Sequence, residues 1–315
     1  MTRDQSYGSF HRNCVEIANG TFIEAARGFS NVAPLSESLS SDRLEMSSIA
    51  KRSMFFDSTN CPVHPAKMSD TPTDWEHVDR ASTALEVFLL GKVDFPSAMG
   101  LQARLMNQVA QRQDRHGIVL VCEHPPTISI GREGSFADVL VDQEELVARQ
   151  MEIRWLNRGG GTFCHVPGQV AVYVMVPLDR LKLGLADYRS RLEQTLVATA
   201  SDLDVDAERA KHVHGATCRC GQFAFIGAGV RDWVTHGGMY VNVSVPQEPL
   251  ELVRWTNGAL RVTSLAAQRT RPTGMATVRE SLVRNLAESL GYDNYHLYTG
   301  HPLLHRSTRK VYVYA

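Results

Sequence analysis

The sequence lacks the patterns that would identify the class of this protein directly. The 315 residues include 33 Lys and Arg against 34 Asp and Glu, so the basic excess typical of nucleic-acid or anionic-membrane binding is absent. No apolar run approaches the roughly 20 residues that a membrane-spanning helix needs. The N-terminus lacks the basic-then-apolar pattern of a signal peptide. We therefore expect a cytoplasmic protein with no nucleic-acid or membrane partner.

Cysteine is scarce, and the common cofactor motifs are absent. Six Cys in a chain of this length do not make a disulfide framework, so reduced thiols are expected. The sequence has no phosphate-binding P-loop, G-x-G-x-x-G, H-E-x-x-H or G-x-S-x-G motif. We therefore expect no cofactor and no metal.

One cluster of metal-ligand residue types leaves the question of zinc open. Its members are His212, His214, Cys218 and Cys220. Only one residue separates the members of each pair, which is closer than zinc sites usually space their ligands. A strand over residues 212–218 would place three of the four on one face. The alternative, a hairpin with incidental side chains, is favoured.

The sequence divides into two regions of different character. Residues 1–74 are rich in polar residues and have no sustained apolar period, which predicts a poorly ordered N-terminal extension. The extension is either a genuine tail or a start-site artefact, in which case Met68 is the favoured start. Residues 75–315 are expected to form one domain. Apolar patterns there predict helices over 96–112, 188–203 and 278–290, among strands such as 118–122, 170–176 and 239–245. Helices and strands do not alternate strictly, which predicts an α+β fold.

Three segments carry a family resemblance. They are residues 119–132, VLVCEHPPTISIGR; residues 158–169, RGGGTFCHVPGQ; and residues 222–243, QFAFIGAGVRDWVTHGGMYVNV. Together they resemble the octanoyltransferase (lipoyl(octanoyl) transferase) family of the biotin/lipoate protein ligase superfamily. The resemblance spans roughly residues 85–290. It implies a fold like the biotin/lipoate protein ligase catalytic domain, with a mixed sheet flanked by helices.

The resemblance also implies an activity, partners and a site. The family moves an octanoyl group from acyl carrier protein to a lysine of a lipoyl domain, so both proteins are expected partners. Glycines allow backbone N–H groups to approach a ligand closely, and Arg158 suits a carboxylate, phosphate or carbonyl, or else a structural salt bridge. The substrate-binding residues that the resemblance implies are Arg158, Gly159, Gly160, Gly161, Thr162, Phe163, Cys164, His165, Phe225, Ile226, Gly227, Gly238, Met239 and Tyr240.

The sequence departs from the family at its two catalytic positions. A Cys thiolate accepts the acyl group in the family, and a Lys favours the thiolate by its charge. Gln222 stands at the Lys position, and an uncharged amide cannot lower a thiol pKa by Coulomb attraction. Asn257 stands at the Cys position, in a loop that is about two residues shorter than expected. The weaker of these two assignments is Asn257, because the shorter loop allows misalignment.

Cys164 is a candidate replacement nucleophile with His165 as its base, because both lie in the glycine-rich segment. Against this hypothesis, neighbours on a strand point to opposite faces, and a free Cys is more often a small buried hydrophobe. Two interpretations therefore remain. One is a transferase with altered chemistry, including direct lysine attack on a bound thioester. The other is a non-catalytic protein that binds an acyl group or a lipoyl domain. An ATP-dependent ligase is disfavoured because ligases of the superfamily also rely on the lysine.

Overall fold

The computed structural model describes residues 84–255, 261–268 and 274–304. The predicted N-terminal extension, the alternative start at Met68 and Asn257 all lie outside the described residues. Within the described ranges, no helix combines the length and the apolar character that crossing a membrane would require.

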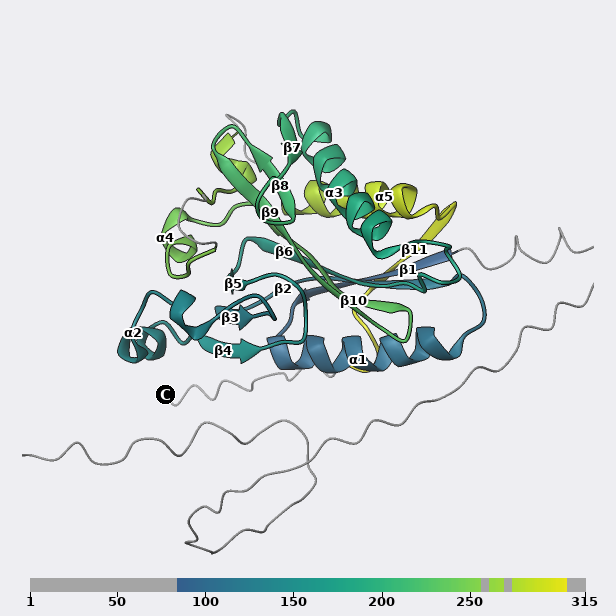
Figure 1. The fold of residues 1–315 in the computed structure, drawn as a ribbon, viewed down its shortest axis with the longest axis horizontal. Coiled ribbons are helices and arrows are strands. Elements are labelled where there is room, and N and C mark those ends of the chain that lie inside the picture. The colour runs from purple at the N-terminus through teal and green to yellow at the C-terminus, as the bar shows by residue number, and fades with distance from the viewer. Residues whose placement is uncertain (1–83, 256–260, 269–273, 305–315) are drawn as a thin grey trace, which may run out of the picture. The chain divides into compact units, whose positions relative to one another are not determined.

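The described residues form a large mixed sheet and a small one (Figure 1). The large sheet has the strand order β11-β1-β2-β6-β10-β9-β8-β7, in which β11, β1 and β2 are parallel and the other neighbours are antiparallel. The small sheet has the order β4-β3-β5. The strands are β1 (Ala84–Lys92), β2 (Gly117–Glu123), β3 (Thr127–Ile130), β4 (Glu152–Trp155), β5 (Thr162–His165), β6 (Gln169–Met175), β7 (Ala207–Arg209), β8 (Gly215–Cys218), β9 (Gly221–Arg231), β10 (Val234–Asn242) and β11 (Asn294–Thr299).

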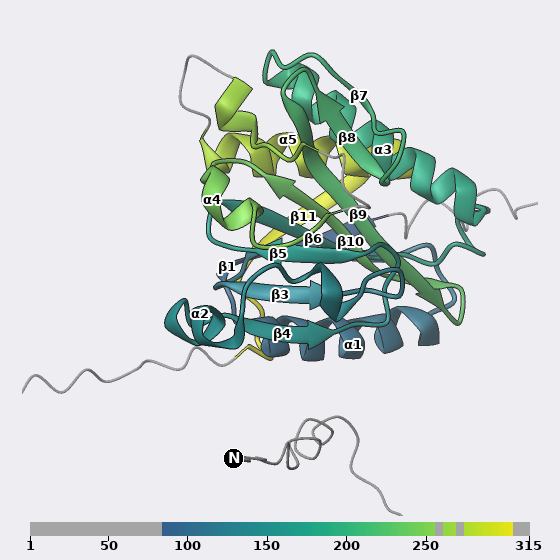
Figure 2. The same cartoon turned by 60° about the vertical axis from the view of Figure 1, so that its left-hand side comes forward.

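Helices cover the two faces of the large sheet unequally. On one face lie α3 (Leu185–Asp202) and α5 (Met275–Leu290), and on the other lie α1 (Phe95–Gln111) and the small sheet (Figures 1 and 2). The shorter helices are α2 (Gln143–Ala148), α4 (Gln247–Leu250) and the 3₁₀ turns η2 (Phe136–Asp138) and η3 (Leu265–Gln268). The central strand β6 is buried along its whole length, because its side chains alternate between the two layers.

Local sequence signals explain the main helices. Asp94 caps α1 by accepting a hydrogen bond from the Ser97 amide at 2.9 Å, and Pro96 occupies the first turn, where its missing N–H costs nothing. Leu101, Leu105 and Val109 then bury one face of α1. The α5 helix ends at Gly291, whose φ of +77° is favoured by glycine.

The predicted α+β fold, a mixed sheet flanked by helices, is confirmed, and three details of the predicted secondary structure are wrong. The strand predicted over 212–218 begins only at Gly215. The glycines at 159–161 form the expected turn, but the strand that follows them, β5, was not predicted; it pairs with β3. Two further strands, β7 and β11, were not predicted. The first has three residues, and every residue of the second is exposed, so neither shows an apolar alternation.

From the packing of α3 and α5 on the sheet, we predict that shortening a buried leucine strongly lowers the free energy of unfolding. Leu286 on α5 is fully buried in the cluster between these helices and the sheet. Leu286→Ala is expected to lower the free energy of unfolding by about 2–5 kcal/mol, through lost burial and a cavity. The matched control is Leu185→Ala on α3, because Leu185 is 61% exposed. Urea denaturation measures both, and equal effects of the two changes would contradict this packing.

Candidate functional site

The glycine-rich loop after β4 is pressed against two strands, which explains its glycines. Gly159 donates its amide hydrogen to the Ala228 carbonyl at 2.8 Å, and a Cβ on Gly159 would lie 2.9 Å from that oxygen. Gly160 has a φ of +78°, and a Cβ on Gly131 would lie 2.3 Å from its carbonyl oxygen. Side chains at these positions would push the loop away from β9 and from the end of β3.

The loop is held by the buried guanidinium of Arg158, which is 2% exposed. Nη1 donates to the carbonyls of Gly159 and Gly161 at 2.9 and 3.1 Å. Nη2 donates to the carbonyl and the hydroxyl of Ser129 at 3.0 and 2.6 Å. The guanidinium carbon lies 4.0 Å from the centre of the Phe163 ring. No carboxylate forms an ion pair with Arg158 among the described residues, so carbonyls and a ring replace the salt bridge that was one predicted role.

A buried chain of hydrogen bonds continues from Ser129. Its hydroxyl lies 2.6 Å from His165 Nε2, and His165 Nδ1 lies 2.8 Å from Gln169 Oε1. The Gln169 amide nitrogen donates to the Cys164 carbonyl and to Asn242 Oδ1. Gln169 Oε1 is therefore an acceptor, which places the proton of His165 on Nδ1 and makes Nε2 the acceptor for the Ser129 hydroxyl. The chain thus fixes one neutral tautomer of His165.

The same chain reaches the segment that contains Gln222. Asn242 Nδ2 donates to the Thr263 carbonyl at 3.1 Å, and the Thr263 amide donates to the Gln222 carbonyl at 3.0 Å. Gln222 is completely buried, and its side-chain nitrogen donates to the carbonyls of Val213 and Ala224 at 3.1 and 3.0 Å. Its Oε1 has no hydrogen-bond partner among the described residues. Both side-chain N–H groups at this position are therefore used to hold backbone.

Cys164 and His165 are adjacent in sequence, but their side chains enter different surroundings. Cys164 is fully buried in an apolar cluster, and burial raises the pKa of its thiol to about 12. Burial lowers the pKa of His165 well below its usual range, and both ring nitrogens already have partners within the network. This geometry does not favour an activated thiolate. The hypothesis of Cys164 as a nucleophile stays a prediction that mutagenesis must test.

Two hollows flank the loop, one on each face of the sheet. The first, of about 180 Å³, lies between α1 and the β9–β10 hairpin, and its walls include Met99, Gln102, Met106, Arg158, His236 and Tyr240. The second, of about 350 Å³, lies beside α3, and its walls include Gly159, Gly160, Tyr188, Arg189, Ile226 and Ala228. Both hollows are mainly apolar, and the first also has the polar side chains of Gln102, Arg158 and His236 in its walls.

The other predicted site residues build the frame around these hollows. Phe163 and Phe225 are buried and pack on Trp255, with ring centres 5.8 and 4.3 Å from it. The Thr162 hydroxyl donates to Asp138 at 3.0 Å. A Cβ on Gly227 would lie 3.0 Å from Arg158 Cδ, and one on Gly238 would lie 1.9 Å from a carbonyl of β6. The carbonyl of Gly161 accepts from Arg158, and Met239 packs in the core beneath α3.

Sequence reasoning missed several contributors to the site. Ser129, Gln169 and Asn242 lie inside the three motif segments, so a signal for them existed. Met99 and Gln102 come from α1, which carries none of the motifs, and only the fold brings them to the loop.

The four predicted ligand-type residues do not gather into a metal site. His214 Nδ1 lies 3.7 Å from Glu193 Oε1, and the Cys218 thiol donates to the Gly221 carbonyl. In the part of the chain that the structure describes, no three His, Cys, Asp or Glu side chains are grouped closely enough to hold a metal ion. The strand that would have aligned them is shorter than predicted.

Comparison with known proteins agrees with this architecture. The family model described as the lipoyl protein ligase A/B catalytic domain matches residues 94–287. Similar solved structures include lipoate-protein ligase A bound with ATP (TM-score 0.56, 16% identity, covering 69% of this chain and 90% of that chain). Another is the bipartite lipoate protein ligase of Thermoplasma acidophilum (TM-score 0.56, 15% identity, covering 70% and 89%). The fold and the match to the family model together define a catalytic domain of the lipoyl protein ligase A/B type.

Relatives with higher sequence identity narrow this class. An octanoyltransferase of Syntrophotalea carbinolica is 32% identical over 205 residues, which cover 63% of this chain and 91% of the relative. An octanoyltransferase of Geobacter metallireducens is 34% identical over 194 residues, covering 61% and 87%. This chain belongs to the octanoyltransferase family of the biotin/lipoate protein ligase superfamily.

The hydrogen-bond chain predicts that Asn242 is important for stability. Asn242→Leu removes the acceptor for Gln169 Nε2 and the donor to the Thr263 carbonyl, and so leaves buried polar groups unpaired. The expected loss in the free energy of unfolding is about 1–3 kcal/mol for each such group. The matched control is Asn107→Leu, since Asn107 is exposed and its side-chain oxygen accepts from Arg231 at 3.0 Å. An Asn242→Leu variant with an unchanged free energy of unfolding would contradict the assigned network.

Two buried histidines predict how stability depends on pH. Burial lowers the pKa of His165 well below its usual range and that of His124 to about 4. Both stay neutral in the folded chain, whereas unfolded histidine binds a proton below about pH 6.5. Stability is therefore highest above that pH and falls as the pH drops, by up to about 1.4 kcal/mol per pH unit for each histidine. Urea denaturation from pH 7.5 to about 5 measures the slope. His165→Gln should reduce it, and a flat profile in the unaltered protein would contradict the assignment.

Proposed function

We propose that this chain is an octanoyl/lipoyl transferase-like protein of protein lipoylation that works without the family's Cys–Lys pair. Its donor is an acyl carrier protein, and its acceptor is a lysine of a lipoyl domain. The observation that carries the proposal is the hollow beside Arg158, an apolar space of about 180 Å³ next to the glycine-rich loop of an octanoyltransferase-family chain. Met99 and Met106 supply walls that suit an acyl chain.

Gln222 determines what chemistry the site offers under this proposal. With an amide at the Lys position and a buried, protonated thiol at Cys164, no described group near the loop supplies an activated sulfur nucleophile. Direct transfer of the acyl group to the acceptor amine needs no sulfur nucleophile on the protein. The acceptor amine attacks the carbonyl carbon of the bound thioester, the C–N bond forms as the C–S bond breaks, and the proton lost by the amine passes to the departing thiolate. The protein contributes binding and orientation of the two reactants.

A specific observation favours a second candidate function. Both N–H groups of the Gln222 side chain donate to backbone carbonyls, so they hold the fold and leave no donor for a substrate. A family member whose former catalytic position serves only structure fits a non-catalytic protein that binds an acyl group or a lipoyl domain. The two candidates share the acyl hollow and differ only in turnover.

Intact-protein mass spectrometry separates these candidates. The full chain is incubated with octanoyl acyl carrier protein and a lipoyl domain, and the masses of all three proteins are followed. Direct transfer is expected to give an octanoylated lipoyl domain while the mass of this chain stays unchanged. An acyl adduct on this chain that Cys164→Ser abolishes would instead identify Cys164 as the nucleophile. If no transfer occurs but the octanoyl carrier protein still binds, the transferase proposal is contradicted and the non-catalytic binding function is supported.

The acyl hollow itself is tested by filling its mouth. Ala103 is an exposed residue of α1 that lines the hollow, so Ala103→Trp places an indole where the chain would enter. We expect binding of octanoyl carrier protein, or transfer from it, to weaken by roughly tenfold or more, equivalent to about 1.4 kcal/mol. The neighbouring exposed Arg104 does not line the hollow, which makes Arg104→Trp the matched control. Equal effects of the two changes would show that the acyl group binds elsewhere.

A further inference from the structure

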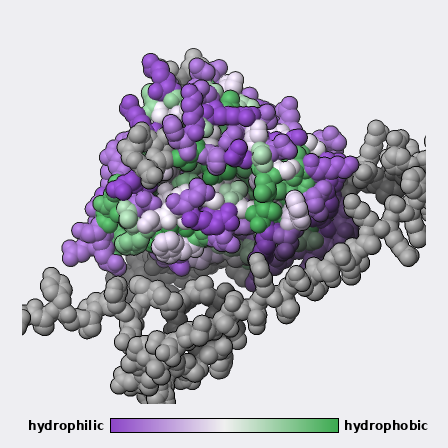
Figure 3. All heavy atoms as spheres, viewed as in Figure 1, coloured by the Kyte–Doolittle hydropathy of each residue, from purple (hydrophilic) through white to green (hydrophobic). Residues whose placement is uncertain are grey.

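The hollow between α1 and the β9–β10 hairpin is distinguished by its polar side chains. Apolar residues lie between hydrophilic ones on the face shown in Figure 3, so apolar surface alone identifies no site. Gln102, Arg158 and His236 also line this hollow. The saturated part of an acyl chain offers them no polar partner, and the few polar groups of an apolar pocket orient the polar end of its ligand. Their place is therefore beside the thioester carbonyl and the amine that attacks it.

His236 is the histidine with a free ring at this hollow. It is half-buried on β10, opposite Gly229 of β9, and a Cβ on Gly229 would lie 2.6 Å from His236 Nε2. The glycine therefore makes room for the imidazole. In the described ranges the His236 ring makes no hydrogen bond, whereas both ring nitrogens of His165 and of His124 are bonded. A reactant can therefore bond to His236 without breaking the buried network.

The charges around His236 favour its neutral form. Arg132 and Arg231 act on the ring, and Arg158 lines the same hollow, where α1 presents uncharged side chains. Burial, and then the charges of Arg132 and Arg231, lower the pKa of His236 below its usual value. The imidazole is therefore neutral at physiological pH and keeps a lone pair that can accept a proton.

The other titratable side chains of this hollow cannot accept a proton at neutral pH. Arg158 and Arg231 already carry theirs. Burial raises the pKa values of Tyr173 and Tyr240, so both keep their hydroxyl protons. Among the described residues that line the hollow, His236 is therefore the one group suited to proton transfer.

We propose that His236 is the general base of the acyl transfer and accepts, at a ring nitrogen, the proton that the acceptor amine loses. This inference rests on the proposed function and adds to binding and orientation a group that moves the proton. The amine nitrogen attacks the thioester carbonyl carbon, and its proton passes to His236 as the C–N bond forms. The C–S bond then breaks, and the imidazolium gives that proton to the departing thiolate. His236 ends neutral, as it began, and the nearby arginines favour this release by opposing a charged ring.

Rates of octanoyl transfer from the carrier protein to a lipoyl domain, measured with the full chain, test this role. His236→Gln retains a polar side chain but no titrating group, so transfer should slow about a hundredfold or more, the usual contribution of a general base. The KM for the octanoyl carrier protein should change little, because the apolar walls of the hollow are intact. Denaturation curves establish that the variant folds.

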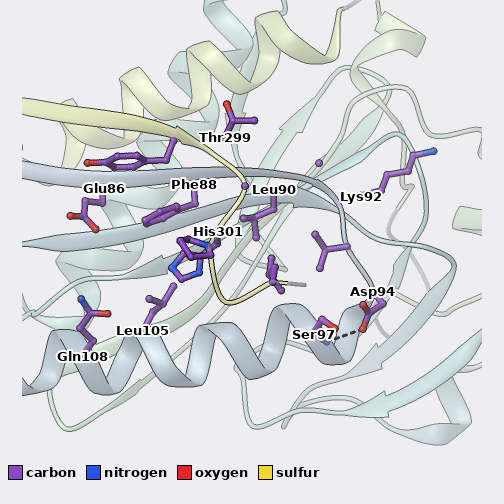
Figure 4. Close-up of a pocket in the computed structure, with 16 residues that line it drawn as sticks. Glu86, Phe88, Leu90, Lys92, Asp94, Ser97, Leu105, Gln108, Thr299 and His301 are labelled. Carbon is purple, nitrogen blue, oxygen red and sulfur yellow. Dashed lines mark hydrogen bonds between the residues drawn. The ribbon is translucent and has the colours of Figure 1, made fainter. Parts of the chain in front are cut away.

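The matched control is His301→Gln. His301 lines another hollow, between β1 and α1 (Figure 4), and burial lowers its pKa as well. The described residues that line that hollow include none from the three motif segments. His301→Gln should therefore leave the transfer rate unchanged, and an equal loss in both variants would overturn the role of His236.

The pH dependence of kcat/KM separates a base from a residue that only supports the fold. The acceptor lysine reacts as the free amine, so below about pH 10 acidification should slow every variant by up to about tenfold per pH unit. Below about pH 6, where His236 also binds a proton, the unaltered protein should slow by up to about a hundredfold per unit. His236→Gln should keep the shallower slope throughout.

The outcomes distinguish this inference from the function on which it rests. If the unaltered chain transfers the octanoyl group but His236→Gln does so at the same rate, the role of His236 is overturned and the proposed transfer stands. A single shallow slope down to about pH 5 in the unaltered protein would overturn that role without any variant. If the unaltered chain transfers nothing, both the proposed transferase function and this inference are overturned.

Discussion

The site depends on a buried cation that has no anionic partner among the described residues. A guanidinium taken out of water is costly unless hydrogen bonds replace its solvation. Around Arg158, four such bonds come from the loop itself and from Ser129, and the Phe163 ring covers the charge. Because the acceptors belong to β3 and to the glycine-rich loop, the side chain ties these two segments together. Glycines outside the loop make room for the cation, since a Cβ on Gly131 would lie 2.6 Å from Arg158 Nη1 and one on Gly227 would lie 3.0 Å from Arg158 Cδ.

The hydrogen-bond chain beyond Arg158 gives the site a fixed shape and little reactivity. It runs through Ser129, His165, Gln169 and Asn242 to Thr263, and the Ser129 hydroxyl accepts from Arg158 and donates to His165. A fully paired buried network is rigid, since any rotation leaves a polar group unsatisfied. It also keeps His165 neutral. This region therefore holds side chains in fixed positions, and no residue in its described part has the properties of an activated nucleophile.

The sequence predicted those parts of the structure that local patterns determine. The continuous apolar run of β6 and the amphipathic face of α1 followed from periodicity, and the three motif segments located the loop, Arg158 and Gln222. Long-range geometry was not predictable in this way. The bond from Asn242 to Thr263 and the arrival of Met99 and Gln102 at the loop depend on the packing of distant elements. The edge strand β11 has no buried face and therefore no pattern.

Gln222 connects the family's chemistry with the fold of this chain. A lysine buried as fully as Gln222, without an acidic partner, would have its pKa lowered by desolvation and would titrate closer to neutrality. Glutamine keeps N–H donors for the carbonyls of Val213 and Ala224 but has no proton to titrate. The predicted exchange of the family's lysine for Gln222 would remove the charge, while the Gln222 side-chain nitrogen holds the carbonyls of Val213 and Ala224. Under the proposed function, the acyl group is bound as in a transferase, and the reactivity for its transfer must come from the acceptor amine.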